Sequence, residues 1–208
     1  MTVRVMLISP AMNAALREAR FAGDAPLDDA GQRQARAAAD AVPAADRLLH
    51  GPSRRCDLTA AALGLRSAPE NALRDWELNR WAGARLDEVS ASDPEGVAAW
   101  LADPSAAPHG GESLLGLCAR AGAWLGSLDG GGPGRVLAVV EPAVVRAAVV
   151  HALDLPPRAF WRIDVAPLTL TELSGRSGRW NLRTGRPLTA ETAGAQAPQP
   201  PPTARLDR

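Results

Sequence analysis

The sequence predicts an α/β fold of three layers, α/β/α, around a mostly parallel central sheet. Short apolar runs alternate along the chain with longer helical stretches, and this order favours parallel strands covered by helices on both faces. The first run, Val3 to Ile8, holds five apolar residues in six and stops at Ser9-Pro10, which is typical of a buried strand that ends in a turn. Arg135 to Val140 is the second clear strand.

The other elements follow from local signals in chain order. Helices are expected where a capping residue or a first-turn proline precedes a helical stretch: 28–42, 54–63, 93–101, 114–128 and 142–153. Further strands are expected at 47–50, 168–173 and 179–183. We expect one domain over 1–183 and a proline-rich tail over 184–208, which holds too few large apolar residues to fold.

Composition excludes several classes of function. A chain of 208 residues can bury one good core. The formal net charge is zero and the basic residues are scattered, so we expect no nucleic-acid partner and no membrane surface. No run approaches the ~20 apolar residues of a membrane-spanning helix. Cys56 and Cys118 are too few for a disulfide framework, which favours a cytoplasmic location.

The loop after the first strand carries the clearest motif. It reads Arg20-Phe21-Ala22-Gly23, followed by Pro26 to Ala35 with the letters PLDDAGQRQA. These residues resemble Gly-Arg-Phe-x-Gly and Pro-Leu-Thr-x-x-Gly-x-x-Gln-Ala, which open the histidine phosphatase (phosphoglycerate-mutase-like) superfamily. Further similar stretches are 50–60, 73–83, 110–113 and 155–162. The resemblance covers about the first 183 residues and implies a phosphoglycerate-mutase-like fold.

The resemblance fails chiefly at the family's catalytic positions. Where the family has Arg-His-Gly with its nucleophilic histidine, this chain has Ser9-Pro10-Ala11, and proline offers no nucleophile. Where the family has Ser-His-Gly-Gly, this chain has Val140-Glu141-Pro142-Ala143. The resemblance therefore implies a degenerate member that lacks both catalytic histidines.

Other positions of the family's site keep suitable side chains. Arg55 falls on the phosphate-binding arginine, Asp75 on the acid-base glutamate, and Arg20 on the loop arginine. The expected catalytic residues are Glu141 and Asp75. The expected ligand-binding residues are Arg55, at the start of a helix, and Ser9, Arg20 and His50, at strand ends or in the first loop. No cofactor and no metal is expected.

The summed charge of the expected site residues distinguishes the functional hypotheses. With Arg55 as the sole cation against Asp75 and Glu141, the local sum is about −1, which disfavours phosphate. The main hypothesis is therefore a pseudophosphatase with a retained ligand cleft, in a regulatory or accessory role. Its ligand would be a small anionic or polar molecule, or a protein partner.

Three alternatives stay open. The first is a repurposed enzyme in which Glu141 and Asp75 act as acid and base while Arg55 anchors an anion. The second is a residual phosphomonoesterase. The third is a divalent metal site built from His50, Cys56, Asp75 and Glu141, although the spacing matches no standard metal motif.

Overall fold

The computed structural model describes residues 2–21, 23–128, 134–176 and 178–189. Six described strands form one sheet in the order β3-β2-β4-β1-β5-β6. The strands are, in chain order, β1 (Val3–Ile8), β2 (Arg47–His50), β3 (Ala68–Pro69), β4 (Arg135–Val139), β5 (Thr169–Arg176) and β6 (Arg179–Pro187). The strands from β3 to β1 in this order are parallel, whereas β5 and β6 add an antiparallel hairpin. The sheet is thus mixed, and the predicted α/β class is confirmed.

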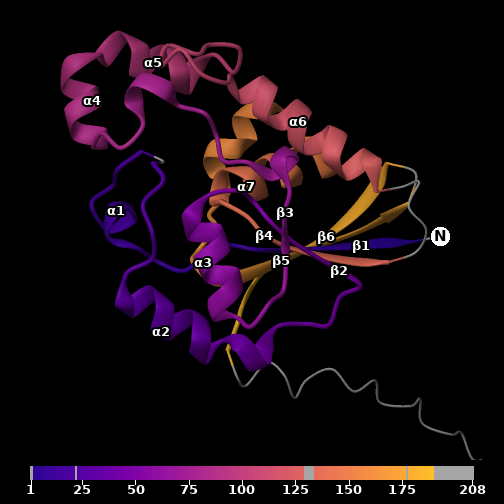
Figure 1. Cartoon of the computed structure of the whole chain (residues 1–208). Coiled ribbons are helices and arrows are strands. Elements are labelled where there is room, and N and C mark those ends of the chain that lie inside the picture. The colour runs from indigo at the N-terminus through magenta and orange to yellow at the C-terminus, as the bar shows by residue number, and fades with distance from the viewer. Residues whose placement is uncertain (1, 22, 129–133, 177, 190–208) are drawn as a thin grey trace, which may run out of the picture.

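Helices cover both faces of this sheet (Figure 1). They are α1 (Ala14–Arg17), α2 (Asp29–Ala37), α3 (Arg54–Ala62), α4 (Leu86–Ser92), α5 (Pro94–Ala102), α6 (Leu114–Ser127) and α7 (Pro142–Ala152). In Figure 1, α2 and α3 lie on one side of the sheet and α6 and α7 on the other, while α1, α4 and α5 gather near the end toward which β1 runs. This is the three-layer arrangement that the sequence predicts.

Successive side chains of a strand point to opposite faces of the sheet, so the hydrophobic core has two parts, one on each face. Val5 and Leu7 of β1 pack into the cluster that contains α6 and α7, whereas Met6 and Ile8 pack into the cluster that contains α2 and α3. All four side chains are at most 1% exposed. A strand buried on both faces reads as a continuous apolar run, and this is why β1 was recognisable from the sequence.

Several boundaries differ from the sequence-based expectation. The helix expected over 28–42 ends as α2 at Ala37, because the Ala38 N–H bonds to the carbonyl of Ala35 as well as to that of Gln34, and the chain tightens into a 3-10 helix over Ala39–Ala41. The strand expected over 179–183 continues to Pro187 as β6. Helices α1 and α4 and the two-residue strand β3 were not predicted.

The tail falls largely outside the described part of the chain. Residues 190–208 lie beyond the described residues, so the division into a domain over 1–183 and a tail over 184–208 stays a prediction. Among the helices of the described ranges, none is long and apolar enough to cross a membrane.

Candidate active site

A cavity opens beside the carboxyl ends of β1 and β4, where the loops of a parallel α/β sheet usually carry chemistry. Its lining combines charged, aromatic and small apolar residues: Asn13, Ala15, Leu16, Arg20, Phe21, Gly23, Arg55, Asp75, Trp76, Leu78, Trp100, Glu141, Pro142, Ala143, Arg146, Phe160 and Trp161. These residues come from segments far apart in the sequence, so the cavity exists only in the folded chain.

Arg55 enters the cavity from the first turn of α3. Ser53 caps this helix, because its Oγ accepts a hydrogen bond of 3.1 Å from the N–H of Cys56. Nη2 of Arg55 lies 3.1 Å from Oε2 of Glu141, yet neither Nε nor Nη2 makes a hydrogen bond within the described part of the chain. A guanidinium that is 9% exposed and has unused N–H donors is suited to an anion that brings its own oxygens.

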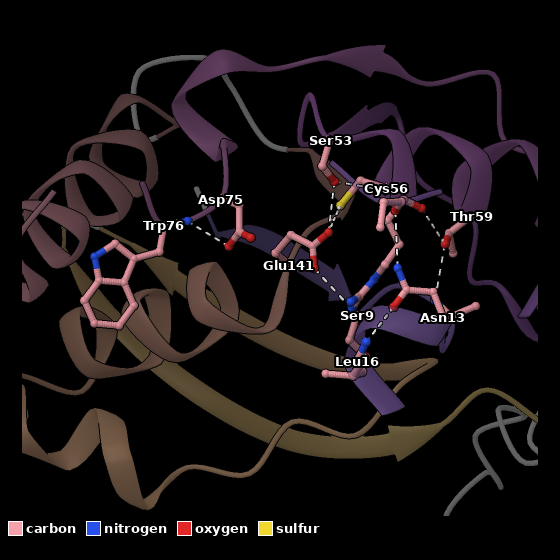
Figure 2. Close-up of polar contacts among 12 residues, drawn as sticks. Ser9, Asn13, Leu16, Ser53, Cys56, Thr59, Asp75, Trp76 and Glu141 are labelled. Atoms are coloured by element: carbon pink, nitrogen blue, oxygen red, sulfur yellow. Dashed lines mark hydrogen bonds and ion pairs between the residues drawn. The ribbon is translucent and has the colours of Figure 1, made fainter. Parts of the chain in front are cut away.

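Glu141 stands between β4 and α7. It occupies the N-cap position, and Pro142 begins the helix in the first-turn place that proline favours. Its Oε1 accepts hydrogen bonds from Ser53 Oγ at 2.9 Å and from Cys56 Sγ at 3.7 Å (Figure 2). Burial, together with the charge of Glu141, holds the pKa of the Cys56 thiol well above its ordinary value. The thiol therefore keeps its proton and acts as a donor to this carboxylate.

Asp75 lies across from Glu141, in the loop after the 3-10 helix Asn71–Leu73 (Figure 2). Its Oδ1 accepts a hydrogen bond of 2.7 Å from the N–H of Trp76. Burial raises the pKa of Asp75 to about 7, and the charge of Glu141 contributes in the same direction. Near neutral pH, Asp75 can therefore either hold or release a proton, as an acid-base group must.

Arg120 of α6 fixes the segment that carries Asp75. Its guanidinium donates to three backbone carbonyls, those of Ala72 (2.9 Å), Arg74 (2.8 Å) and Asp75 (3.3 Å). Glu112 balances the charge of Arg120 through two hydrogen bonds of 2.9 and 2.6 Å. This network holds the backbone at the acid-base residue in one conformation.

Two further arginines line the cavity. Arg20 donates from Nη1 to the carbonyl of Gly83 at 3.2 Å and from Nε to Glu18 at 2.7 Å. Arg146 lies over the ring of Phe160, 5.6 Å from its centroid. Burial lowers the pKa of Arg146, and its Nε makes no hydrogen bond within the described part of the chain.

These arginines reverse the charge expected from the sequence. Among the lining residues, Arg20, Arg55 and Arg146 face Asp75 and Glu141, which gives a sum of +1 if both carboxyls ionise. Glu18, outside the lining, pairs with Arg20 and offsets one of these positive charges. The predicted value of about −1 is wrong because it omitted Arg146 and left Arg20 uncounted. The cavity therefore lacks the negative charge that would exclude an anion.

The structure brings together most of the predicted site. Glu141, Asp75, Arg55 and Arg20 line the cavity. Ser9 does not, because it is fully buried and its Oγ donates to the carbonyl of Ala166 at 2.5 Å, where it joins the end of β1 to the loop before β5.

His50 also lies outside the cavity. Its Nδ1 shares a hydrogen bond of 2.8 Å with Ser67 Oγ, and its Nε2 lies 3.8 Å from Asp57. This position removes it from the metal site considered above, and no group of three or more His, Cys, Asp or Glu side chains within the described ranges has a metal-binding arrangement. None of the three histidines of the chain lines the cavity.

Sequence reasoning missed Arg146 and the aromatic lining. A signal for Arg146 was present, since it follows Pro142 by four residues on α7 and therefore shares its helix face. The aromatic residues Trp76, Trp100, Phe160 and Trp161 gave no such signal, because they come from separate segments that only the fold brings together.

Comparison with known proteins shows that the chain is similar to phosphatases. It is 32% identical over 183 residues to a glucosyl-3-phosphoglycerate phosphatase of Mycobacterium tuberculosis, covering 76% of this chain and 82% of that protein. It is 40% identical over 103 residues to a glucosyl-3-phosphoglycerate phosphatase of Mycolicibacterium vanbaalenii, covering 47% and 46%. A solved structure of a mycobacterial glucosyl-3-phosphoglycerate phosphatase superposes with a TM-score of 0.79 at 25% identity, covering 90% of this chain and 100% of that one.

These relatives contradict the pseudophosphatase interpretation. All are named as phosphatases, and two of them, the Mycobacterium tuberculosis protein and the solved structure, match this chain over most of its length. The physical premise of that interpretation, a cavity of negative charge, is also absent from the structure.

The sequence resemblance now has independent support. The model of the histidine phosphatase superfamily (branch 1) matches residues 11–186, which include the whole cavity lining. The fold and this match agree with the motifs around Arg20, Arg55 and Asp75. The chain belongs to the histidine phosphatase superfamily, branch 1.

Proposed function

We propose that the chain is a phosphomonoester hydrolase whose anion site is centred on Arg55. The observation that carries this proposal is the buried guanidinium of Arg55, whose Nε and Nη2 make no hydrogen bond in the described ranges although Nη2 is ion-paired with Glu141, in a cavity that two further arginines line. Unsatisfied buried donors are costly, and the oxygens of a phosphoryl group would satisfy them. The ligand is thus a small anionic molecule rather than a protein.

The comparisons support a phosphoryl ligand. One solved structure of a mycobacterial glucosyl-3-phosphoglycerate phosphatase is a complex with VO3, an oxyanion. That structure superposes on this chain with a TM-score of 0.78 at 27% identity. A cytoplasmic location, consistent with the free Cys56 and Cys118, remains part of the proposal.

The cavity has no histidine, so we assign water as the nucleophile. Glu141 accepts a proton from this water as its oxygen forms a bond to phosphorus. The bond between phosphorus and the alcohol oxygen breaks, and Asp75 gives its proton to that oxygen. The products are the free alcohol and inorganic phosphate, and solvent returns Glu141 and Asp75 to their starting states.

The remaining groups stabilise charge and geometry. Arg55, with Arg20 and Arg146 around the same cavity, offsets the charge that spreads over the phosphoryl oxygens in the transition state. Ser53 and Cys56 hold Glu141 in place by their hydrogen bonds to Oε1. In this assignment, the acid-base pair of the repurposed-enzyme alternative performs the reaction of the residual phosphomonoesterase.

Turnover of 4-nitrophenyl phosphate by the purified chain tests the proposal. Arg55→Ala is expected to lower kcat/KM at least 100-fold, a loss of about 2.7 kcal/mol of transition-state stabilisation. The matched control is Arg54→Ala, since Arg54 is the preceding arginine on the same helix and is exposed. It is expected to stay within twofold of the parent. Equal turnover in all three proteins would point to a contaminating phosphatase, and no turnover in the parent would refute the proposal.

A further inference from the structure

Five aromatic side chains line the cavity and contact one another through their rings. This aromatic wall consists of the rings that line the cavity: Phe21, Trp76, Trp100, Phe160 and Trp161. Trp76, Trp100 and Phe160 are 5, 8 and 1% exposed, whereas Phe21 and Trp161 are half-buried. The chain has six Trp and two Phe, so much of its aromatic content gathers at this one place.

The rings of the wall hold one another in place. Trp100 and Trp161 pack edge to face with centroids 4.5 Å apart, and Trp76 lies 5.2 Å from Trp100 at an interplanar angle of 34°. Phe160 contacts both Trp76, at 5.3 Å, and Trp161, at 5.1 Å. Such tilted and edge-to-face pairs are the stable arrangements of aromatic rings, so the wall is formed before any ligand binds.

Trp76 is also anchored by its polar atom. Its Nε1 donates to the backbone carbonyl of Glu112 at 2.7 Å, and the side chain of Glu112 is in turn paired with Arg120. The indole therefore keeps its orientation toward the cavity at little further entropic cost when a ligand arrives.

The wall begins next to the proposed acid. Asp75 and Trp76 are consecutive, and the N–H of Trp76 bonds to the Asp75 carboxylate, so the acid and the wall share one rigid piece of backbone. In the proposed reaction, Asp75 must contact the oxygen that links phosphorus to the alcohol. The carbon skeleton attached to that oxygen then starts beside the wall.

A second lobe of the same opening adds acidic side chains. It shares Asp75, Trp76 and Glu141 with the first cavity and adds the exposed side chains of Asp24, Glu77 and Asn79. The carboxylates of Asp24 and Glu77 repel a second anionic group there. Of the five rings of the wall, only Trp76 lines this second lobe, so the stacking surface lies on the side of the first cavity.

We propose, on the basis of the proposed function, that the aromatic wall selects phosphate monoesters whose alcohol carries a flat apolar ring system. Stacking and removal of apolar surface from water provide the selection. Small aliphatic phosphates leave the wall unused, and sugar phosphates bury less apolar surface against it than a flat apolar ring system does.

Three esters of primary alcohols test this selection at similar leaving-group acidity: 2-(2-naphthyl)ethyl phosphate, ethyl phosphate and glucose 6-phosphate. We expect kcat/KM for the naphthyl ester to exceed that of each of the others at least 30-fold. If glucose 6-phosphate or ethyl phosphate is hydrolysed equally well, the selection by the wall is refuted while the hydrolase function stands.

Variants of Trp161 link the preference to the wall. Trp161 is half-buried, so its truncation is expected to leave a folded protein, which the melting temperature checks. Trp161→Ala is expected to lower kcat/KM for the naphthyl ester at least tenfold and that for ethyl phosphate less than threefold, whereas Trp161→Phe keeps most of the preference. An equal loss on both substrates would overturn the assignment.

Binding of non-hydrolysable phosphonates separates the two proposals. Calorimetry is expected to show that 2-(2-naphthyl)ethylphosphonate binds at least tenfold more tightly than ethylphosphonate, and that Trp161→Ala removes the difference. If no ester is hydrolysed but this difference appears, the hydrolase function fails and the wall assignment stands. Equal affinities would refute the wall assignment, whatever the enzyme hydrolyses.

Discussion

Nη2 of Arg55 lies 3.1 Å from Oε2 of Glu141, and these side chains are only 10% and 9% exposed. A buried ion pair contributes little more to folding stability than a well-packed apolar pair, but a buried charge that has lost its partner is strongly destabilising. The pair also leaves N–H groups of Arg55 without a hydrogen bond, which costs stability. The same N–H groups can donate to a bound anion. Its geometry is best explained by ligand binding.

The first prediction concerns the stability of this pair. Arg55→Met is expected to lower the free energy of unfolding by ~3 kcal/mol, because the Glu141 carboxylate then stays buried without its cation. The double variant Arg55→Met/Glu141→Gln is expected to recover at least ~1 kcal/mol of this loss. Urea denaturation of the parent, both single variants and the double variant measures the coupling, and purely additive losses would contradict it.

A second prediction follows from the pKa of Asp75, about 7 against an ordinary 3.8. A group whose pKa is raised by folding stabilises the protein fully below its unfolded pKa and loses that contribution as the pH rises through the folded pKa. Asp75→Asn is therefore expected to change the free energy of unfolding more favourably at pH 8 than at pH 4, with a difference on the order of 2 kcal/mol. Melting temperatures at both pH values check the sign, and an equal shift at both would contradict it.

The third prediction concerns the same group in the reaction. If Asp75 donates its proton to the leaving oxygen, kcat/KM must fall above pH 7 as the carboxyl ionises. Asp75→Asn is expected to lose this limb of the pH profile. The loss of activity should also be larger on phenyl phosphate than on 4-nitrophenyl phosphate, because phenol is the weaker acid and depends more on protonation. Equal losses on the two esters would argue against general acid catalysis.

Much of the fold was predictable because it depends on local signals. The buried runs that became β1 and β4 and the caps Ser53 and Ser113 mark their elements within a few residues. Helix α4 was missed because its sequence, LDEVSAS, holds two serines and little apolar periodicity. Its N-cap is Arg85, whose side chain has no acceptor for a backbone N–H, although Glu88 accepts a hydrogen bond of 3.0 Å from the N–H of Arg85.

The site was predictable only where a motif carried it. Arg55, Asp75 and Glu141 follow recognisable motifs and do meet in the cavity. Ser9 and His50 also stand at strand ends, but position at an edge does not fix the direction of a side chain, and both bond elsewhere. The charge of the site depended on Arg146, which only the packing of α7 brings into the cavity.

A fourth prediction contrasts two helical glycines. A Cβ on Gly31 of α2 would lie 2.2 Å from the backbone oxygen of Met12, whereas a Cβ on Gly126 of α6 would meet nothing within 4 Å. Gly126→Ala is therefore expected to stabilise the protein by ~0.5 to 1 kcal/mol through helix propensity. Gly31→Ala is expected to destabilise it by ~1 to 3 kcal/mol, because the loop after β1 must move. Thermal unfolding of both variants measures the contrast, and stabilisation by both would show that this contact is not tight.

The last prediction tests whether Arg120 positions the acid. Arg120 and Glu112 are each 11% exposed. Removal of Arg120 takes the donor from the carbonyls of Ala72, Arg74 and Asp75 and leaves the Glu112 carboxylate with the Arg74 guanidinium, 3.7 Å away. Arg120→Met is expected to cost ~3 kcal/mol of stability, as for other buried pairs that lose one partner.

A purely structural role would end with that loss of stability. A positioning role predicts more, because a shift of Asp75 of about 1 Å is enough to cost on the order of 100-fold in rate. Measured at a temperature where circular dichroism shows the variant fully folded, kcat is expected to fall more than KM rises. The limb of the pH profile assigned to Asp75 should also move, since Arg120 lowers the pKa of that group and its removal raises it. If the folded variant keeps the parent kcat and pH profile, Arg120 supports the fold alone and Asp75 is held by its bond to Trp76.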